Sequence, residues 1–180
     1  MPKIIYILLV SLIIIPLALP TSLQAAHMTA HDIGVNVPGI QYGYDHMSEM
    51  TAFLGDTGTR FVRDTFDLQL YKGSSSESWY NRAGLVLDEY EDKDITVMGI
   101  LTNTKDPQIS DLSAWRSDVR EVVTRFSGRI TYWQIGLLPE QIGTADHYGE
   151  VLKIASEEIK NNDPTAKVVT GGLSYTSASV

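Results

Sequence analysis

The sequence predicts an α/β fold with a parallel sheet, and three observations support this prediction. Short β-branched segments alternate with amphipathic helical segments. The stretches between successive strands are long enough for crossover helices. Polar and aromatic residues gather just after the predicted strand ends, at 63–67, 102–104 and 133–141. About five β/α units in register therefore indicate an α/β protein.

Each element follows from its local pattern. The predicted strands are 33–37, 60–66, 95–101, 130–135 and 167–170. Apolar residues at helical spacing predict helices around 47–54, 112–126 and 148–159, with a weaker one around 85–90. Gly58, Gly128 and the run Asn162-Asp163-Pro164 are typical of helix ends.

Two architectures fit such a pattern, an open doubly wound sheet and a (β/α)8 TIM barrel. The first is typical of nucleotide-binding proteins, but no G-x-G-x-x-G follows a strand and no phosphate loop of the G-x-x-x-x-G-K-[ST] type is present. Polar residues at the carboxyl ends of strands are where barrel enzymes build their sites. The sequence therefore favours a partial (β/α)8 barrel.

Residues 1–26 resemble a secretory signal peptide. A lone Lys3 precedes an apolar run that Pro16 interrupts, and a small and polar stretch ends at Ala26. The run is short for a membrane-spanning helix, which needs roughly 20 apolar residues. An uncleaved N-terminal anchor is the alternative. We expect a secreted or extracytoplasmic domain over residues 27–180.

Composition excludes several functions. The formal net charge of −8 makes nucleic acid a poor partner. The chain has no cysteine, which excludes disulfides and thiolate chemistry. Its four histidines show no metal-binding spacing. We expect no metal and no cofactor.

The most informative segment is 132–140, which reads Y-W-Q-I-G-L-L-P-E. It resembles the fourth barrel strand of the retaining glycoside hydrolase clan that includes cellulase-like and xylosidase-like families, where the pattern is W-E-I-G-N-E-P. Trp133, Ile135, Gly136 and Pro139 keep that frame. Weaker matches, R-F-V-R at 60–63, V-V-T-R-F at 122–126 and D-P-T-A-K-V-V at 163–169, occur in the same order.

The resemblance implies an active site at the end of this strand and also the loss of its Asn-Glu pair. In the clan, the Asn of the N-E pair contacts the sugar 2-hydroxyl and the Glu is the acid/base, whereas this chain has Leu137 and Leu138 in their place. Retaining hydrolysis needs two carboxyl groups about 5 to 5.5 Å apart. Glu140 is the nearest substitute, but two residues of extended chain displace it by roughly 6 to 7 Å. We therefore expect no catalytic residue at this strand.

The clan's nucleophile is a Glu at the end of the seventh strand, and this sequence stops soon after the fifth. A barrel typically needs about 250 residues. The sequence is therefore expected to be a truncated gene or fragment, or a product whose sheet is completed by a partner chain or by a second copy.

Three residues remain as candidates for substrate binding: Arg63, Trp133 and Gln134. By resemblance, Arg63 matches an arginine that ends the second strand and holds the nucleophile ionised; pairing with a neighbouring acid such as Asp64 is the alternative. Trp133 is expected either to stack on a sugar or to pack in the core. Trp79 is expected to form a subsite platform or to belong to the second helix.

These observations favour a secreted, glycoside-hydrolase-like protein that is catalytically inactive. Its expected ligand is an oligo- or polysaccharide. The alternatives are a carbohydrate-binding or protein-interaction module, and the N-terminal part of a larger hydrolase that cleaves O-glycosidic bonds.

Overall fold

Five parallel strands form one sheet in a computed structural model of the chain, which describes residues 34–37, 39–42, 46–70 and 76–172. The predicted signal segment, 1–26, lies outside the described residues. The strands are β1 (Gly34–Asn36), β2 (Phe61–Asp67), β3 (Thr96–Thr102), β4 (Tyr132–Ile135) and β5 (Lys167–Thr170).

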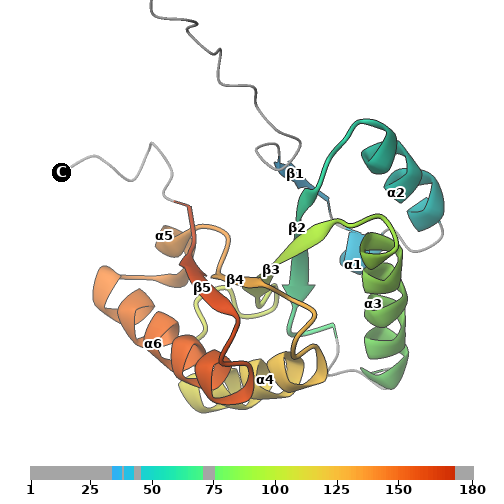
Figure 1. Cartoon of the computed structure of the whole chain (residues 1–180). Helices are drawn as coiled ribbons and strands as arrows, with labels where there is room; N and C mark the ends of the chain where they lie inside the picture. The colour runs from blue at the N-terminus through green and yellow to red at the C-terminus, as the bar shows by residue number, and fades with distance from the viewer. Residues whose placement is uncertain (1–33, 38, 43–45, 71–75, 173–180) are drawn as a thin grey trace, which may run out of the picture.

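The order of the strands in the sheet is the order in the chain, β1-β2-β3-β4-β5 (Figure 1). A doubly wound sheet reverses direction at a switch point, whereas a barrel adds each strand beside the previous one. The sheet does not close among the described residues, where β1 and β5 each have one neighbouring strand. The prediction of an α/β fold that forms part of a barrel is therefore confirmed.

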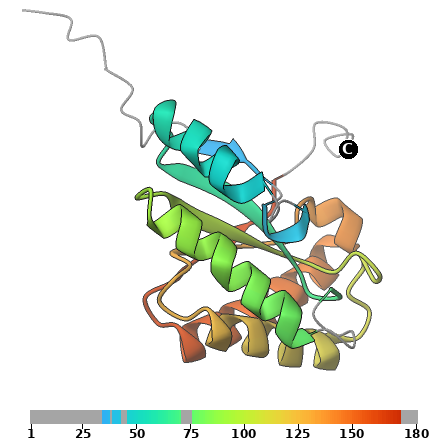
Figure 2. The same ribbon diagram turned by 90° about the vertical axis from the view of Figure 1, so that its right-hand side faces the viewer.

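Helices connect the strands and lie along one side of the sheet (Figures 1 and 2). The four predicted helices are confirmed as α2 (Met47–Asp56), α3 (Ser76–Glu91), α4 (Leu112–Arg125) and α6 (Ala145–Asn162). Two four-residue helices were not predicted, α1 (Gly39–Tyr42) and α5 (Pro139–Ile142).

Local chemistry sets the helix ends. The Asp111 side chain accepts a hydrogen bond from the backbone N–H of Ala114 at 2.9 Å and so caps α4, and Thr144 caps α6 in the same way. Gly128, with φ of 79°, follows α4 in the left-handed conformation that glycine adopts without strain.

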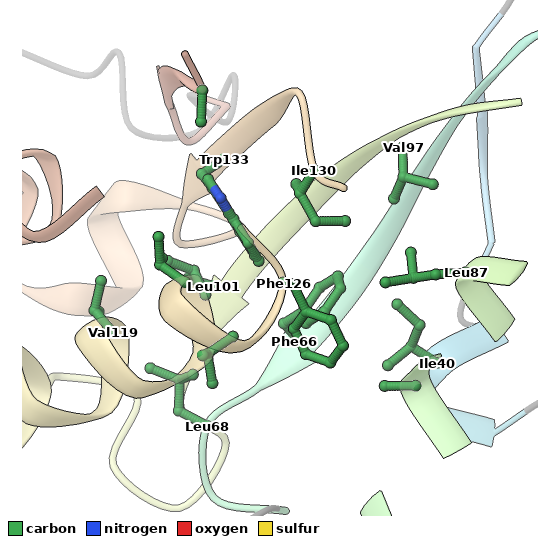
Figure 3. Packing of buried hydrophobic residues seen from close by; sticks show 14 of the residues in the cluster. Ile40, Phe66, Leu68, Leu87, Val97, Leu101, Val119, Phe126, Ile130 and Trp133 are labelled. Atoms are coloured by element: carbon green, nitrogen blue, oxygen red, sulfur yellow. The ribbon is translucent and has the colours of Figure 1, made fainter. Parts of the chain in front are cut away.

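Alternate side chains of each strand face the helices. The register pairs Asp64 with Gly99 and Gly99 with Trp133, so these three residues face the same way. The core lies on this helix-covered face, where Phe66, Phe126 and Trp133 pack together (Figure 3). The opposite face, which we call the open face, carries Arg63, Gln134 and their register partners.

Gly99 allows this packing. The centroids of the Phe66 and Trp133 rings lie 5.0 Å apart in an edge-to-face arrangement. A Cβ at position 99 would lie 2.6 Å and 2.8 Å from two atoms of the Trp133 ring and 3.1 Å from Phe66. The ring of Trp133 therefore occupies the space of a side chain that Gly99 lacks.

A buried carboxyl group anchors α1. Asp64 is fully buried, and its Oδ2 accepts hydrogen bonds from the backbone N–H of Ile40 and the hydroxyl of Tyr90, both at 3.0 Å. Burial raises the pKa of Asp64 from 3.8 to about 7, although the hydrogen bonds partly oppose this shift. Asp64 thus joins β2 to both α1 and α3.

We predict that Gly99→Ala destabilises the fold by about 1–3 kcal/mol, because the new methyl group overpacks the core against Trp133. The matched control is Gly149→Ala in α6, where an added Cβ meets no atom within 4 Å. Its higher helix propensity should leave stability unchanged or slightly increased. Equal urea midpoints for the two variants would contradict this account.

We predict that stability falls as the pH rises from 5 to 7, and that Asp64→Asn loses this dependence. The unfolded carboxyl ionises near pH 4, whereas the folded one keeps its proton up to about pH 7, so the slope reaches at most ~1.4 kcal/mol per pH unit. The pKa values of Glu158 and Asp163 are lowered, so their contributions change only at more acidic pH. Parallel curves of unfolding free energy against pH for the unmodified chain and for Asp64→Asn would contradict this prediction.

Candidate functional site

Arg63 and Gln134 form a hydrogen-bonded pair at the centre of the open face. Arg63 Nε donates to Gln134 Oε1 at 2.8 Å, and Gln134 Nε2 donates to the carbonyl oxygen of Gly136 at 2.7 Å. Gln134 is only 4% exposed, and burial lowers the pKa of Arg63. The structure therefore brings together two of the three predicted substrate-binding residues.

Arg63 does not pair with its neighbour Asp64, because successive side chains of a strand point to opposite faces. Asp64 is directed to the helix side, where it binds Ile40 and Tyr90. Arg63 is also the third residue of β2, which continues to Asp67, and so does not end the strand as the resemblance implied.

Trp133 lies on the other face of β4. Its side chain is fully buried in the core and packs against Phe66. Trp79 is likewise buried, within α3. Of the alternatives set out for Trp133, core packing describes its position, and the site below contains neither tryptophan.

A pocket of about 410 Å³ opens at the carboxyl ends of β2, β3 and β4. Polar side chains come from the end of β2, from the segment after β3 and from α5. Apolar ones come from the β3–α4 loop and from the segment after β4. The lining residues are Thr65, Thr102, Asn103, Thr104, Pro107, Ile109, Gly136, Leu137, Leu138, Gln141 and Ile142.

Hydrogen bonds hold Thr104, one of the polar residues that line the pocket, in place. The carboxyl group of Asp67, itself buried, accepts from the backbone N–H of Thr104 at 3.2 Å and from the Thr104 hydroxyl. The hydroxyl of Thr102 is buried and has no hydrogen-bond partner among the described residues. The grouping of 102–104 that the sequence suggested is therefore present at the pocket.

The turn after β4 places both leucines in the pocket wall. Gly136 has φ of 69°, and a Cβ there would lie 2.6 Å from Ile142 Cδ1, so glycine suits this position on both counts. The backbone N–H of Gly172 donates to the carbonyl oxygen of Leu137 at 3.1 Å. Leu137 is 42% exposed and Leu138 is half-buried.

Glu140 lies apart from this pocket. It is exposed in α5 and lines a separate depression of about 360 Å³ with Tyr148 and Gly171. Tyr148 joins the ends of β4 and β5 there, because its hydroxyl donates to the carbonyl oxygen of Ile135 at 3.0 Å and accepts from Gly171 N at 2.9 Å. The structure does not bring Glu140 to the pocket that Leu138 lines.

Sequence reasoning missed the apolar part of the pocket that Pro107, Ile109 and Ile142 supply. The signal for this part of the pocket is Ile109, an isolated isoleucine in the otherwise polar remainder of the loop after 102–104, which indicates that the loop packs inward. No group of three or more possible metal ligands occurs among the described residues. No described helix is both long and apolar enough to cross a membrane.

No family model matches the sequence, and no curated protein matches it closely enough to indicate a family. The fold, in contrast, is similar to solved glycoside hydrolases. A family 39 glycoside hydrolase from the gut symbiont Bacteroides cellulosilyticus aligns over 77% of this chain with a TM-score of 0.59 and 14% identity. The chain has a partial (β/α)8-barrel fold, similar to part of the barrel of these solved structures.

Two further structures agree with this fold. The family 1 β-glucosidase of Thermotoga maritima aligns over 71% of the chain with a TM-score of 0.60 and 12% identity. The endoglucanase Cel5A of Pseudomonas stutzeri aligns over 77%, with a TM-score of 0.58 and 17% identity. This partial barrel covers 31%, 36% and 50% of the three solved chains, in the order given.

We predict that Gln134→Leu destabilises the partial barrel by about 1–3 kcal/mol, because Arg63 Nε loses its acceptor and the Gly136 carbonyl loses its donor. The matched control is Gln141→Leu, at an exposed position of α5. Its effect should stay within about 0.5 kcal/mol. Urea unfolding checks both, and equal losses would show that the buried pair contributes nothing specific.

Proposed function

We propose that this chain is a secreted, glycosidase-like protein that binds a saccharide in the pocket at the carboxyl ends of β2–β4 and does not hydrolyse glycosidic bonds by itself. One observation carries the proposal. Leu137 and Leu138 line the pocket at the end of β4, where the resembled clan has its Asn-Glu pair.

The chemistry of the pocket supports binding without hydrolysis. A retaining glycosidase needs one carboxyl group to protonate the leaving oxygen and another to attack the anomeric carbon, about 5 to 5.5 Å apart. Among the described residues, those that line the pocket include no Asp and no Glu. Their hydroxyl and amide groups can still hydrogen-bond sugar hydroxyls.

Neighbouring acids do not replace the missing pair. Asp67 is buried and its carboxyl group already accepts hydrogen bonds from Thr104 and Gln69. Glu140 lines the other depression, and a general acid must come within about 3 Å of the atom that it protonates. Neither carboxyl group therefore replaces the missing pair, and this supports a binding role for the pocket.

The proposed location rests on residues 1–26, whose apolar run and small-residue end resemble a secretory signal. Retention of the segment as a membrane anchor is the alternative. Either form places the barrel portion outside the cytoplasm, where saccharides are the expected ligands.

A second candidate function is the N-terminal portion of a larger hydrolase. The observation that favours it is coverage, since the chain spans between 31% and 50% of the compared glycoside hydrolases. The remaining strands would come from further sequence, from a partner chain or from a second copy. Each would pair with the edges that β1 and β5 present among the described residues.

We predict that the purified chain does not hydrolyse aryl glycosides above the background rate. Release of nitrophenol from a panel of nitrophenyl glycosides measures this directly. Leu138→Glu should remain inactive, because a single carboxyl group leaves the pocket without a nucleophile. Turnover by the unmodified chain that Glu140→Gln abolishes would overturn the proposal.

A further inference from the structure

The pocket has two walls of different chemistry. Thr65, Asn103 and Thr104 supply hydroxyl and amide groups near the ends of β2 and β3. The other lining residues, from the β3–α4 loop, the turn after β4 and α5, are mostly apolar, and they include Pro107, Ile109, Leu137, Leu138 and Ile142. No charged side chain lines it in the part of the chain that the structure describes, so the pocket suits a neutral ligand with a polar and an apolar part.

The hydroxyl of Thr102 lies behind this polar side of the pocket. Its Oγ1 is inaccessible to solvent and has no hydrogen-bond partner within the described part of the chain, so a ligand in the pocket does not reach it. The polar groups open to a ligand are those of Thr65, Asn103 and Thr104, which are half-buried or exposed.

Leu137 is the exposed part of the apolar wall, and its backbone is held in place. Leu137 is 42% exposed, whereas Ile109 and Ile142 are buried, at 3% and 4%. Its carbonyl oxygen is bonded by Gly172, and Gly136 N donates to the carbonyl oxygen of Leu101 at 2.9 Å. Backbone hydrogen bonds at Gly136 and at Leu137 therefore hold the Leu137 side chain in its exposed position.

We propose that the pocket binds an alkyl or aryl glycoside, with the sugar hydroxyls against Thr65, Asn103 and Thr104 and the apolar substituent against Leu137 and Leu138. This inference rests on the proposed saccharide-binding function and narrows it. An unsubstituted sugar leaves the leucines in water, whereas a substituted one covers them. The volume of about 410 Å³ lies in the range of small-molecule sites, about 300–1,000 Å³.

The test compares methyl and n-hexyl β-glycosides of glucose, galactose, mannose and xylose by titration calorimetry of the full chain. For at least one sugar, the hexyl glycoside should bind at least about tenfold more tightly than the methyl glycoside, because its methylenes leave water. Free hexanol should bind at least about tenfold more weakly than that hexyl glycoside, because it cannot satisfy the polar wall.

Variants assign the effect to each wall. Leu137→Ser should reduce the hexyl-to-methyl ratio to about threefold or less. Its matched control is Leu85→Ser in α3, since Leu85 is 45% exposed and lies outside the pocket. Thr65→Val should weaken both glycosides by about the same factor and leave the ratio unchanged. Thermal unfolding of each variant establishes that it is folded before titration.

The outcomes separate this inference from the proposed function. Equal affinity for methyl and hexyl glycosides, or equal affinity for hexanol and the hexyl glycoside, overturns the inference. The first of these results leaves saccharide binding standing. A folded chain that binds none of the sugars overturns the proposed function and the inference together. A tenfold ratio that Leu137→Ser removes and Leu85→Ser preserves supports it.

Discussion

The packing of Trp133 and Phe66 over Gly99 is the constraint on which the rest of the structure depends. Side chains alternate along a strand, so a shift of one residue in register would exchange the two faces of the sheet. Only glycine at position 99 admits the Trp133 ring. Because this contact fixes which residues of β2, β3 and β4 meet the helices, it also fixes Arg63 and Gln134 on the open face.

The hydrogen bond between Arg63 and Gln134 on the open face depends on this packing, and it is connected to the edge of the pocket. Thr65, Ile100 and Gln134 are register partners, and Ile100 is fully buried although it lies outside the main core cluster. Gln134 Nε2 donates to the carbonyl oxygen of Gly136, the residue that begins the turn carrying Leu137. Two hydrogen bonds thus connect Arg63 and Gln134 on the open face to the turn at the edge of the pocket.

The sequence predicted the long elements because their signals are local. The four amphipathic helices and five strands were identified with ends within a few residues, except for α3, which begins well before the predicted 85. The two short helices depend on other information. Asp64, which is distant in sequence, holds α1 through the N–H of Ile40. Helix α5 had only the local signal of Pro139 at its first turn.

The site could be predicted only in part, for similar reasons. The grouping of Thr102 with its neighbours follows from strand ends meeting at one edge of a parallel sheet. The partner of Arg63 depends on the register between β2 and β4 through β3, which the sequence alone does not specify. The same is true of Glu140, whose distance along the chain from Leu138 says little about the turn that separates them.

Ile109, which lines the pocket, has an energetically unfavourable backbone conformation. It is a β-branched residue with φ of 52°, a conformation that costs roughly 1–3 kcal/mol. Asp106 holds the loop by accepting from Ser110 N at 2.7 Å, and His147 Nε2 is hydrogen-bonded to the Gln108 carbonyl oxygen at 2.8 Å. The loop is therefore fixed to itself and to α6, and Ile109 remains buried.

A pocket built in this way is preformed, so a ligand that enters it does not have to order the loop. Hydrolysis would need charged groups in this fixed wall, whereas Leu137 and Leu138 make it apolar. The proposed binding needs only the shape and the hydrogen-bonding groups, which the turn at Gly136 and residues Thr65, Asn103 and Thr104 provide. The leucines that leave the end of β4 without a carboxyl group are therefore also the residues that would contact the apolar substituent of the proposed ligand.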